Sequence, residues 1–252
     1  MTAPKAAGEA SRPYVFCHML TSLDGKIMGD FMATANGSEA GEVFCDLVFS
    51  AKRFYRHQGW LSGRVTTDDN FTFFEKPALP ESFAPVPAGD FVAARTGMYY
   101  VSIDPKGRLG WKEIALTYAG VTAHVVEVLT EEASEAYRAF LRGLGISYVI
   151  AGRSALDAPL ALAKLREKFG VETLMLGGGG VLNWSFIRQG LCDEVSVVLS
   201  ASADASPKTP ALFTAREGLS QAAPVDFELI GAEKRGRNTL WLRYRTVEIL
   251  GR

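Results

Sequence analysis

Short, almost continuous apolar stretches recur along the chain and predict the strands of a buried sheet. The first spans residues 13–20 (PYVFCHML) and has few polar positions, as expected of a strand that is covered on both faces. Similar stretches follow at residues 59–63, 98–103, 123–129, 148–151 and 173–176. Because helical patterns separate the later stretches, we expect an α/β fold with a mostly parallel central sheet flanked by helices.

Apolar positions at helical spacing predict helices between these strands. One helix is expected over residues 38–57, with Ser38 as its N-cap. A second is expected over residues 130–144, which open with acidic residues in the first turn. A third, over residues 160–169, should end at Gly170, because glycine readily adopts the left-handed conformation that closes a helix.

The C-terminal part of the chain has a strand-only pattern. Strands are predicted at residues 194–200, 227–235 and 239–247. The last two should form an antiparallel hairpin around residues 236–238, added to the parallel sheet. Residues 77–90 are proline-rich and predict an irregular excursion. We expect a single domain over residues 13–252, preceded by a disordered tail of residues 1–12.

Composition excludes several classes of partner. The chain has 252 residues, of which 48% are hydrophobic, and 27 basic residues balance 28 acidic ones. This balance gives no electrostatic attraction for nucleic acid or an anionic membrane. No apolar run approaches the roughly 20 residues of a membrane span, and the N-terminus lacks a signal-peptide core. We expect a cytoplasmic protein with free thiols at Cys17, Cys45 and Cys192 and no bound metal.

A glycine loop is the strongest chemical signal. Four consecutive glycines (Gly177, Gly178, Gly179 and Gly180) follow the strand at 173–176 and precede a helix-like segment that begins with Val181 and Leu182. Backbone without Cβ atoms can approach a ligand closely, and amides at a helix N-terminus favour an anion such as a pyrophosphate. A G-x-G-x-x-G fingerprint does not fit, because Leu182 and Asn183 occupy the places of its last glycine.

Two further motifs lie where strands end. In S-L-D-G-K (residues 22–26), Asp24 and Gly25 turn the chain sharply and present Lys26 beside the strand end. In G-R-V-T (residues 63–66), Gly63 permits a turn, Arg64 supplies a guanidinium group suited to a phosphate, and Thr66 supplies a hydroxyl donor.

These three motifs, in this order, resemble those of the riboflavin-biosynthesis pyrimidine reductases, which form the C-terminal half of bacterial bifunctional deaminase-reductases. The matching segments are residues 12–27, 63–71 and 176–194. The resemblance implies a dihydrofolate reductase-like fold, NADPH as cofactor and a homodimer. It also implies hydride transfer to a pyrimidine such as 5-amino-6-(5-phosphoribosylamino)uracil. No deaminase motif is present, so another protein would have to deaminate.

Roles for single residues also come from this resemblance. Catalytic positions would be Asp24 and Lys26, with Asp24 or water as proton donor. Substrate contacts would come from Lys26, Ser38 and Phe71. The cofactor would be bound by the glycine loop with Val181 and Leu182, by Thr21 and Ser22 at the nicotinamide, and by Gly63, Arg64, Thr66 and Asp69. In dihydrofolate reductases, the matching arginine meets the 2′-phosphate of NADPH and the threonine its pyrophosphate.

Two departures from the family pattern leave alternatives open. Only two residues separate Thr66 from Asp69, which is fewer than usual, and Gly177 stands where a glutamate commonly reaches the substrate. The alternatives are a related reductase with another imine or carbonyl substrate, and an NADPH-binding protein without turnover. His18, in a strand, and His57, near a helix end, are expected to be structural.

Overall fold

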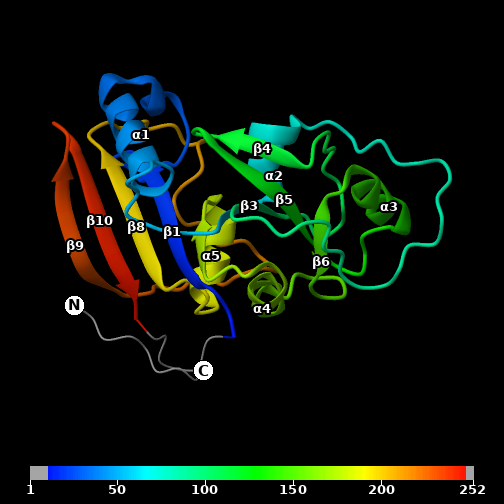
Figure 1. The fold of residues 1–252 in the computed structure, drawn as a ribbon. Coiled ribbons are helices and arrows are strands. Elements are labelled where there is room, and N and C mark those ends of the chain that lie inside the picture. The colour runs from blue at the N-terminus through cyan, green and yellow to red at the C-terminus, as the bar shows by residue number, and fades with distance from the viewer. Residues whose placement is uncertain (1–10, 248–252) are drawn as a thin grey trace.

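The predicted apolar stretches form the middle of a ten-stranded sheet in the computed structural model, which describes residues 11–247 (Figure 1). The strand order is β4-β5-β3-β2-β7-β1-β8-β10-β9, and β6 also pairs with β5. Seven strands are mutually parallel: β1 (Tyr14–Thr21), β2 (Gly59–Gly63), β3 (Tyr99–Ile103), β5 (Val121–Leu129), β6 (Ser147–Ile150), β7 (Thr173–Leu176) and β8 (Glu194–Ser200). The prediction of a mostly parallel α/β sheet is confirmed.

The antiparallel strands lie at the two ends of this sheet. The hairpin of β9 (Phe227–Arg235) and β10 (Thr239–Thr246) pairs with β8, as predicted. The other antiparallel strand, β4 (Ala115–Tyr118), pairs with β5 and was not predicted. Its last two residues are exposed, so it lacks the apolar pattern that marks the central strands.

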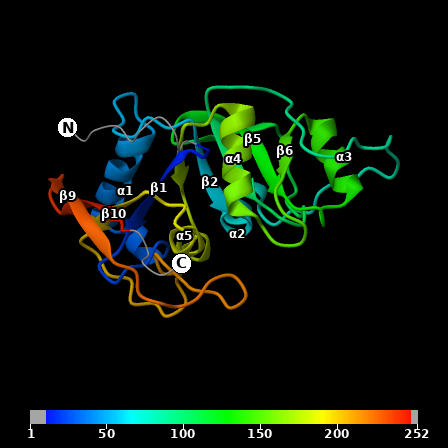
Figure 2. The same ribbon diagram turned by 90° about the horizontal axis from the view of Figure 1, so that it is seen from below.

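Helices cover both faces of the sheet (Figure 1 and Figure 2). One face carries α1 (Ala35–Val48) and α3 (Glu135–Leu144), whose apolar residues pack with Phe16 of β1. The opposite face carries α4 (Ala158–Phe169) and α5 (Gly180–Arg188), which pack with Val15 and Cys17 of the same strand. Successive residues of β1 therefore serve two separate cores, which explains its continuous apolar run.

The helix boundaries correct two predictions. The N-cap of α1 is Thr34, four residues before Ser38, and it accepts a hydrogen bond from the Gly37 amide at 3.0 Å. The helix ends at Val48, and Phe54 beyond it packs on Trp241 at 4.9 Å from a loop, not a helix. Helix α3 is capped by Ser134, because Thr130 bonds to the Pro105 carbonyl oxygen instead.

The third predicted helix is close to the observed one. Helix α4 begins at Ala158, where the Asp157 side chain accepts from the Leu160 amide at 2.9 Å. It ends at Gly170, whose φ of 68° is left-handed, as predicted.

The structure describes part of the expected N-terminal tail and the whole proline-rich segment. Most of the expected N-terminal tail lies outside the described residues, but Arg12 is anchored to Asp193 by two hydrogen bonds of 2.8 and 2.9 Å. The proline-rich segment runs out past α3 and returns beside β6, away from α5 (Figure 1). There Phe91 pairs with Tyr148 of β6.

Candidate active site

Three parallel strands, β1, β7 and β2, are neighbours in the sheet, so their C-terminal ends meet at one edge. Two backbone bonds join the loops that follow them. The Gly177 amide donates to the Leu61 carbonyl oxygen at 2.8 Å, and the Gly63 amide donates to the Gly178 carbonyl oxygen at 2.9 Å. The structure thus brings the glycine loop and the G-R-V-T motif, more than a hundred residues apart in sequence, into direct contact.

Within the glycine loop, two positions require glycine. Gly178 has a φ of +96°, which L side chains rarely adopt. At Gly180 a Cβ atom would lie 2.2 Å from the Ala211 carbonyl oxygen. Gly179 is different, because its Cβ would meet only Thr66 Oγ1, at 3.5 Å. The absence of a side chain at Gly179 therefore leaves space between the loop and Thr66.

Helix α5 presents its amides to this space. Gly179 is its N-cap, and the first intrahelical bond runs from the Asn183 amide to the Gly179 carbonyl oxygen at 3.0 Å. The amides of Gly180, Val181 and Leu182 precede that bond, so the helix itself offers them no acceptor. Such a helix N-terminus can bind an anion, in agreement with the predicted role of this loop.

The G-R-V-T motif is helical where a loop was expected. Helix α2 (Arg64–Thr67) starts directly after Gly63 and continues into a π-helical turn, Asp68–Thr72. Arg64 Nη1 donates to Asp68 Oδ2 at 2.6 Å, so the predicted phosphate ligand already has a carboxylate partner. Asp68 is buried, whereas Asp69, the aspartate that we predicted to contact the cofactor, is exposed. The contact of Asp68 with Arg64 was not predicted.

The S-L-D-G-K turn is closed by its own side chains. Ser22 is buried, and its hydroxyl donates to Asp24 Oδ1 at 2.7 Å and accepts from the Lys26 amide at 2.9 Å. The Ser22 amide donates to the Lys26 carbonyl oxygen at 3.0 Å, and the Ser22 carbonyl oxygen accepts from the Gly25 amide at 3.0 Å. Both the side chain and the backbone of Ser22 are therefore engaged within the turn, which argues against the predicted nicotinamide contact. Thr21, the last residue of β1, is also buried.

Asp24 holds a loop and is a poor proton donor. Its carboxylate accepts from Ser22 and from the amides of Asp204 and Ala205, at 3.0 and 2.9 Å. The hydrogen bond from Ser22, followed by those from the loop amides, lowers the pKa of Asp24 to about 2. Asp24 is therefore ionised at neutral pH, which argues against its predicted role as proton donor and in favour of water.

The segment after β8, residues 201–214, was not predicted as part of the site. It lies against both motifs: the Leu212 amide donates to the Gly25 carbonyl oxygen at 3.0 Å, and the Thr214 amide donates to that of Gly180 at 3.1 Å. Lys26 Nζ reaches the Thr209 carbonyl oxygen at 3.5 Å. The segment has no strand or helix pattern, so the sequence alone gave no signal for this position.

The two other predicted substrate residues lie on different elements. Ser38 is exposed in the first turn of α1, whose cap residue Thr34 contacts Ser202 beyond β8. Phe71 packs edge-on against Tyr100 and Tyr118, at ring distances of 4.8 and 6.1 Å. The structure therefore places these two side chains in different surroundings.

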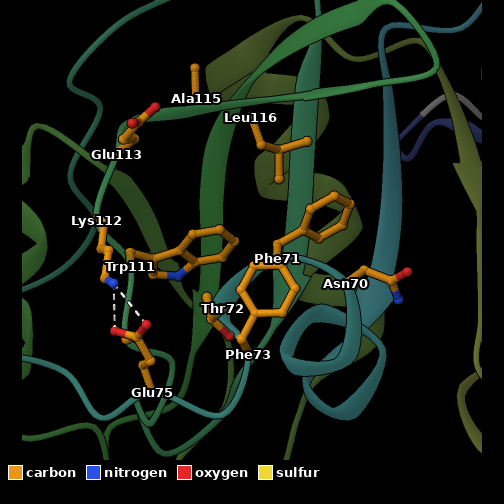
Figure 3. A pocket seen from close by; sticks show the side chains of 11 residues that line it. Asn70, Phe71, Thr72, Phe73, Glu75, Trp111, Lys112, Glu113, Ala115 and Leu116 are labelled. Atoms are coloured by element: carbon orange, nitrogen blue, oxygen red, sulfur yellow. Dashed lines mark hydrogen bonds and ion pairs between the residues drawn. The ribbon is translucent and has the colours of Figure 1, made fainter.

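A cavity of about 320 Å³ lies beside Phe71. Figure 3 shows the rings of Phe71, Phe73 and Trp111 around it, with Leu116 above them and the Glu75–Lys112 ion pair on one side. Phe73 is exposed and has a φ of +51°. Three aromatic rings thus border the cavity, and it adjoins the helical turn that follows Thr66.

Two buried carboxylates, Asp104 and Glu127, were not predicted. Asp104, directly after β3, accepts from the Leu109 amide at 2.9 Å, and Glu127 in β5 accepts from Trp111 Nε1 at 2.5 Å. Burial raises the pKa of both groups, and that of Glu127 well above its usual range. Glu127 lies in an otherwise apolar strand pattern, which is the one feature that could have drawn attention to it.

His18 and His57 are structural, as expected. His18 Nε2 donates to the Phe44 carbonyl oxygen, and Nδ1 accepts from Ser196, which in turn accepts from Trp241 Nε1. Burial lowers the pKa of both histidines to about 4. Both are away from the glycine loop, on β1 and before β2.

Comparison with known proteins decides the family. The family described as the RibD C-terminal domain matches residues 13–203. The chain belongs to this family of riboflavin-biosynthesis reductases. It is 32% identical over 192 residues to the 2,5-diamino-6-ribosylamino-4(3H)-pyrimidinone 5′-phosphate reductase of Methanothermobacter thermautotrophicus, an alignment that covers 75% of this chain and 78% of the relative. Family membership makes the protein an oxidoreductase.

Solved structures with low sequence identity show the same fold. Acinetobacter baumannii RibD matches with a TM-score of 0.63 and 18% identity over 96% of this chain, which spans 60% of that protein's length. The riboflavin biosynthesis reductase Rib7 of Saccharomyces cerevisiae matches with a TM-score of 0.59 and 13% identity, covering 96% of this chain and 93% of that one. The predicted reductase fold is therefore confirmed.

No helix within residues 11–247 is long and apolar enough to cross a membrane. In the same range, no three histidine, cysteine, aspartate or glutamate side chains are grouped as a metal site would require.

Proposed function

We propose that this protein is an NADPH-dependent reductase that acts on a ribosylamino-pyrimidine 5′-phosphate, such as 5-amino-6-(5-phosphoribosylamino)uracil. The observation that carries the proposal is the meeting of three motifs at one sheet edge: the glycine loop with α5, the Gly63–Thr66 segment and the S-L-D-G-K turn. The name of the archaeal relative, a pyrimidinone 5′-phosphate reductase, supports the substrate class.

The residues at this edge fit a dinucleotide. The amides of Gly180, Val181 and Leu182 would hold the pyrophosphate, and Thr66 faces the same space across Gly179. Arg64 begins α2 at the point where Gly63 bonds to Gly178, so its guanidinium would bind the 2′-phosphate of the nucleotide. We keep Asp69 as a weaker candidate contact, because it is exposed on the same helical turn. The nicotinamide would lie toward Thr21.

The bound cofactor would supply a hydride, and the chain supplies orientation and electrostatics. Reduction of a ring-opened ribose imine to the amine would consume that hydride and one proton, and because Asp24 is ionised the proton would come from water. The Asp24 carboxylate keeps the 201–214 segment in place over the turn. Lys26, on the same turn, would bind the substrate through its ammonium group. Ser38 and Phe71 lie in different surroundings, so their substrate contacts stay separate predictions.

Calorimetric titration with NADPH and NADH, on the native protein and on Arg64→Ala, tests the cofactor. We expect micromolar NADPH binding, weaker NADH binding and a loss of about 1.5–3 kcal/mol for NADPH on mutation, the usual scale of a charged hydrogen bond. Cofactor oxidation with the pyrimidine phosphate then tests the reaction. Absence of binding by either nucleotide would refute the proposal, and binding without oxidation would indicate a non-catalytic protein.

The aromatic cavity favours a second candidate, a reductase for another imine or carbonyl heterocycle. Its charged residues are Glu75, Glu113 and Lys112, of which Glu75 is paired with Lys112, so the net charge around the cavity is negative. This balance disfavours a phosphate at that position and suits an uncharged planar ring. Comparing turnover of the phosphorylated pyrimidine with that of its dephosphorylated form separates the two candidates.

A homodimer through the C-terminal strands is part of the proposal. In the β8-β10-β9 part of the sheet, Leu199 lies opposite Leu240, and Val197 lies opposite Leu242. These side chains point away from Trp241, which is buried on the α1 side. Leu240 and Leu229 are exposed to 42% and 56%, so this face presents apolar side chains, with Lys234 opposite Leu240, that a second copy would cover. Cytoplasmic location agrees with the free cysteines.

A further inference from the structure

The guanidinium group of Arg64 forms an ion pair with a buried carboxylate, that of Asp68. Its Nη1 atom donates to Asp68 Oδ2 at 2.6 Å, one helical turn further along. The Asp68 side chain is 6% exposed and that of Arg64 is 34% exposed, so the carboxylate lies beneath the arginine. The contact therefore fixes the side of Arg64 that faces the protein and leaves part of the group open to a ligand.

Asp68 is itself fixed by a third residue. The Thr72 hydroxyl donates to Asp68 Oδ1 at 2.6 Å, and Thr72 is 4% exposed. Arg64, Asp68 and Thr72 are spaced by four residues along α2 and the π-helical turn, so their side chains share one side of the helix. Both carboxylate oxygens of Asp68 are thereby engaged, and the carboxylate cannot rotate without losing one bond.

A second carboxylate lies close to the same arginine. The charge of Arg64 acts to lower the pKa of Asp104, although burial raises it overall. One Asp104 oxygen accepts from the Arg108 and Leu109 amides, and Oδ1 has no hydrogen-bond partner within the described residues. The carboxylates beside Arg64 could act on NADPH binding in two ways. If Asp68 orients Arg64, removing its charge should weaken NADPH binding. If Asp68 only neutralises Arg64 and repels the phosphate, removing its charge should strengthen NADPH binding.

We propose that Asp68 is a positioning residue that favours NADPH over NADH by holding Arg64 ready for the 2′-phosphate. A free arginine side chain loses rotamer freedom when it binds a ligand, and prior fixation removes that cost. Only a nucleotide with a 2′-phosphate gains from this fixation, since NADH has no group at that position. The inference rests on the proposed NADPH site.

The test is the dissociation constant of NADPH and of NADH, by calorimetry, for the native protein, Asp68→Asn and Thr72→Val. We expect Asp68→Asn to weaken NADPH binding about tenfold and Thr72→Val about threefold, with NADH changed less than about twofold in each. Glu228→Gln, which removes a carboxylate from the exposed pair with Arg245 in the C-terminal hairpin, is the matched control and should change neither constant. In an Arg64→Ala background, Asp68→Asn should have no further effect.

The outcomes separate the inference from the proposed function. A fall in the NADPH-to-NADH preference that depends on Arg64 supports positioning. Tighter NADPH binding by Asp68→Asn would show that Asp68 acts only as an opposing charge, and equal weakening of both nucleotides would show a structural role; either result overturns the inference. If Asp68→Asn does not fold, Thr72→Val carries the same test. Failure of the native protein to bind NADPH would refute the proposed function itself.

Discussion

The backbone amide of Gly63 donates to the carbonyl oxygen of Gly178 at 2.9 Å. This bond connects the end of β2 with the glycine loop after β7, and it fixes the start of α2 beside the start of α5. Arg64 and Thr66 therefore lie next to Gly179, although neither helix alone contains enough polar groups to bind a dinucleotide. The candidate cofactor site exists only where the two loops meet.

Substitution of Gly179 should separate ligand binding from folding. Its φ of −73° is accessible to alanine, and the new Cβ would meet only Thr66 Oγ1. We expect Gly179→Ala to fold with nearly native stability but to bind NADPH roughly tenfold more weakly, because the methyl group fills the ligand space. Calorimetry and urea unfolding measure the two effects.

Gly143→Ala is the control for this substitution. Gly143 lies within α3, and a Cβ atom added there would have nothing within 4 Å beyond its own stretch of helix. Alanine at this position should stabilise the fold by about 0.5–1 kcal/mol and leave NADPH binding unchanged. Native NADPH affinity in Gly179→Ala would contradict the assigned ligand space.

Asp24 should affect stability in acid but not proton transfer. Its pKa is lowered from 3.8 to about 2 in the folded state, so its contribution to stability is present above pH 3.8 and is lost as the pH falls toward 2. Asp24→Asn should remove this acid-side dependence in urea unfolding. The pH profile of kcat between about pH 6 and 8 should keep its shape, and disappearance of a titration there would restore Asp24 as the proton donor.

His18 should make the protein less stable in mild acid. Burial lowers its pKa from 6.5 to about 4, so the unfolded chain takes up a proton before the folded one does. The stability is complete above about pH 6.5 and declines as the pH falls toward 4, by at most about 3 kcal/mol. His18→Gln, which keeps one donor and one acceptor, should flatten this part of the unfolding curve; an unchanged slope would refute the prediction.

Leu240 should be required for dimer formation. It is 42% exposed on the apolar face formed by β8, β10 and β9. Leu240→Lys should convert the proposed dimer into a folded monomer. The new ammonium group would be buried at the interface without a partner, which costs free energy of association. Light scattering measures the mass. Leu219→Lys, at a 59% exposed leucine in the loop before β9, should remain dimeric, and a monomeric native protein would remove this part of the proposal.

The sequence alone determined the three motifs and every strand except β4, because hydrophobic periodicity, glycine runs and turn residues are local properties. The apolar runs of β1 and β7 and the glycines before α5 are examples. The hydrophobic pattern was insufficient where side chains contact segments that are distant in the sequence. The pattern predicted that α1 continues to His57. Phe54 and Tyr55 fit a helical spacing, but they pack against Trp241 from a loop and not from a helix.

Only the tertiary structure decided how the site residues are used. Asp24 meets the amides of Asp204 and Ala205, about 180 residues away, and this contact turns an expected proton donor into a structural anchor. Arg64 is oriented by Asp68, which becomes buried only when α2 packs against the sheet. A residue type indicates which chemistry is available. Which charge is buried, and which hydrogen bonds are already taken, depends on segments that the fold brings together.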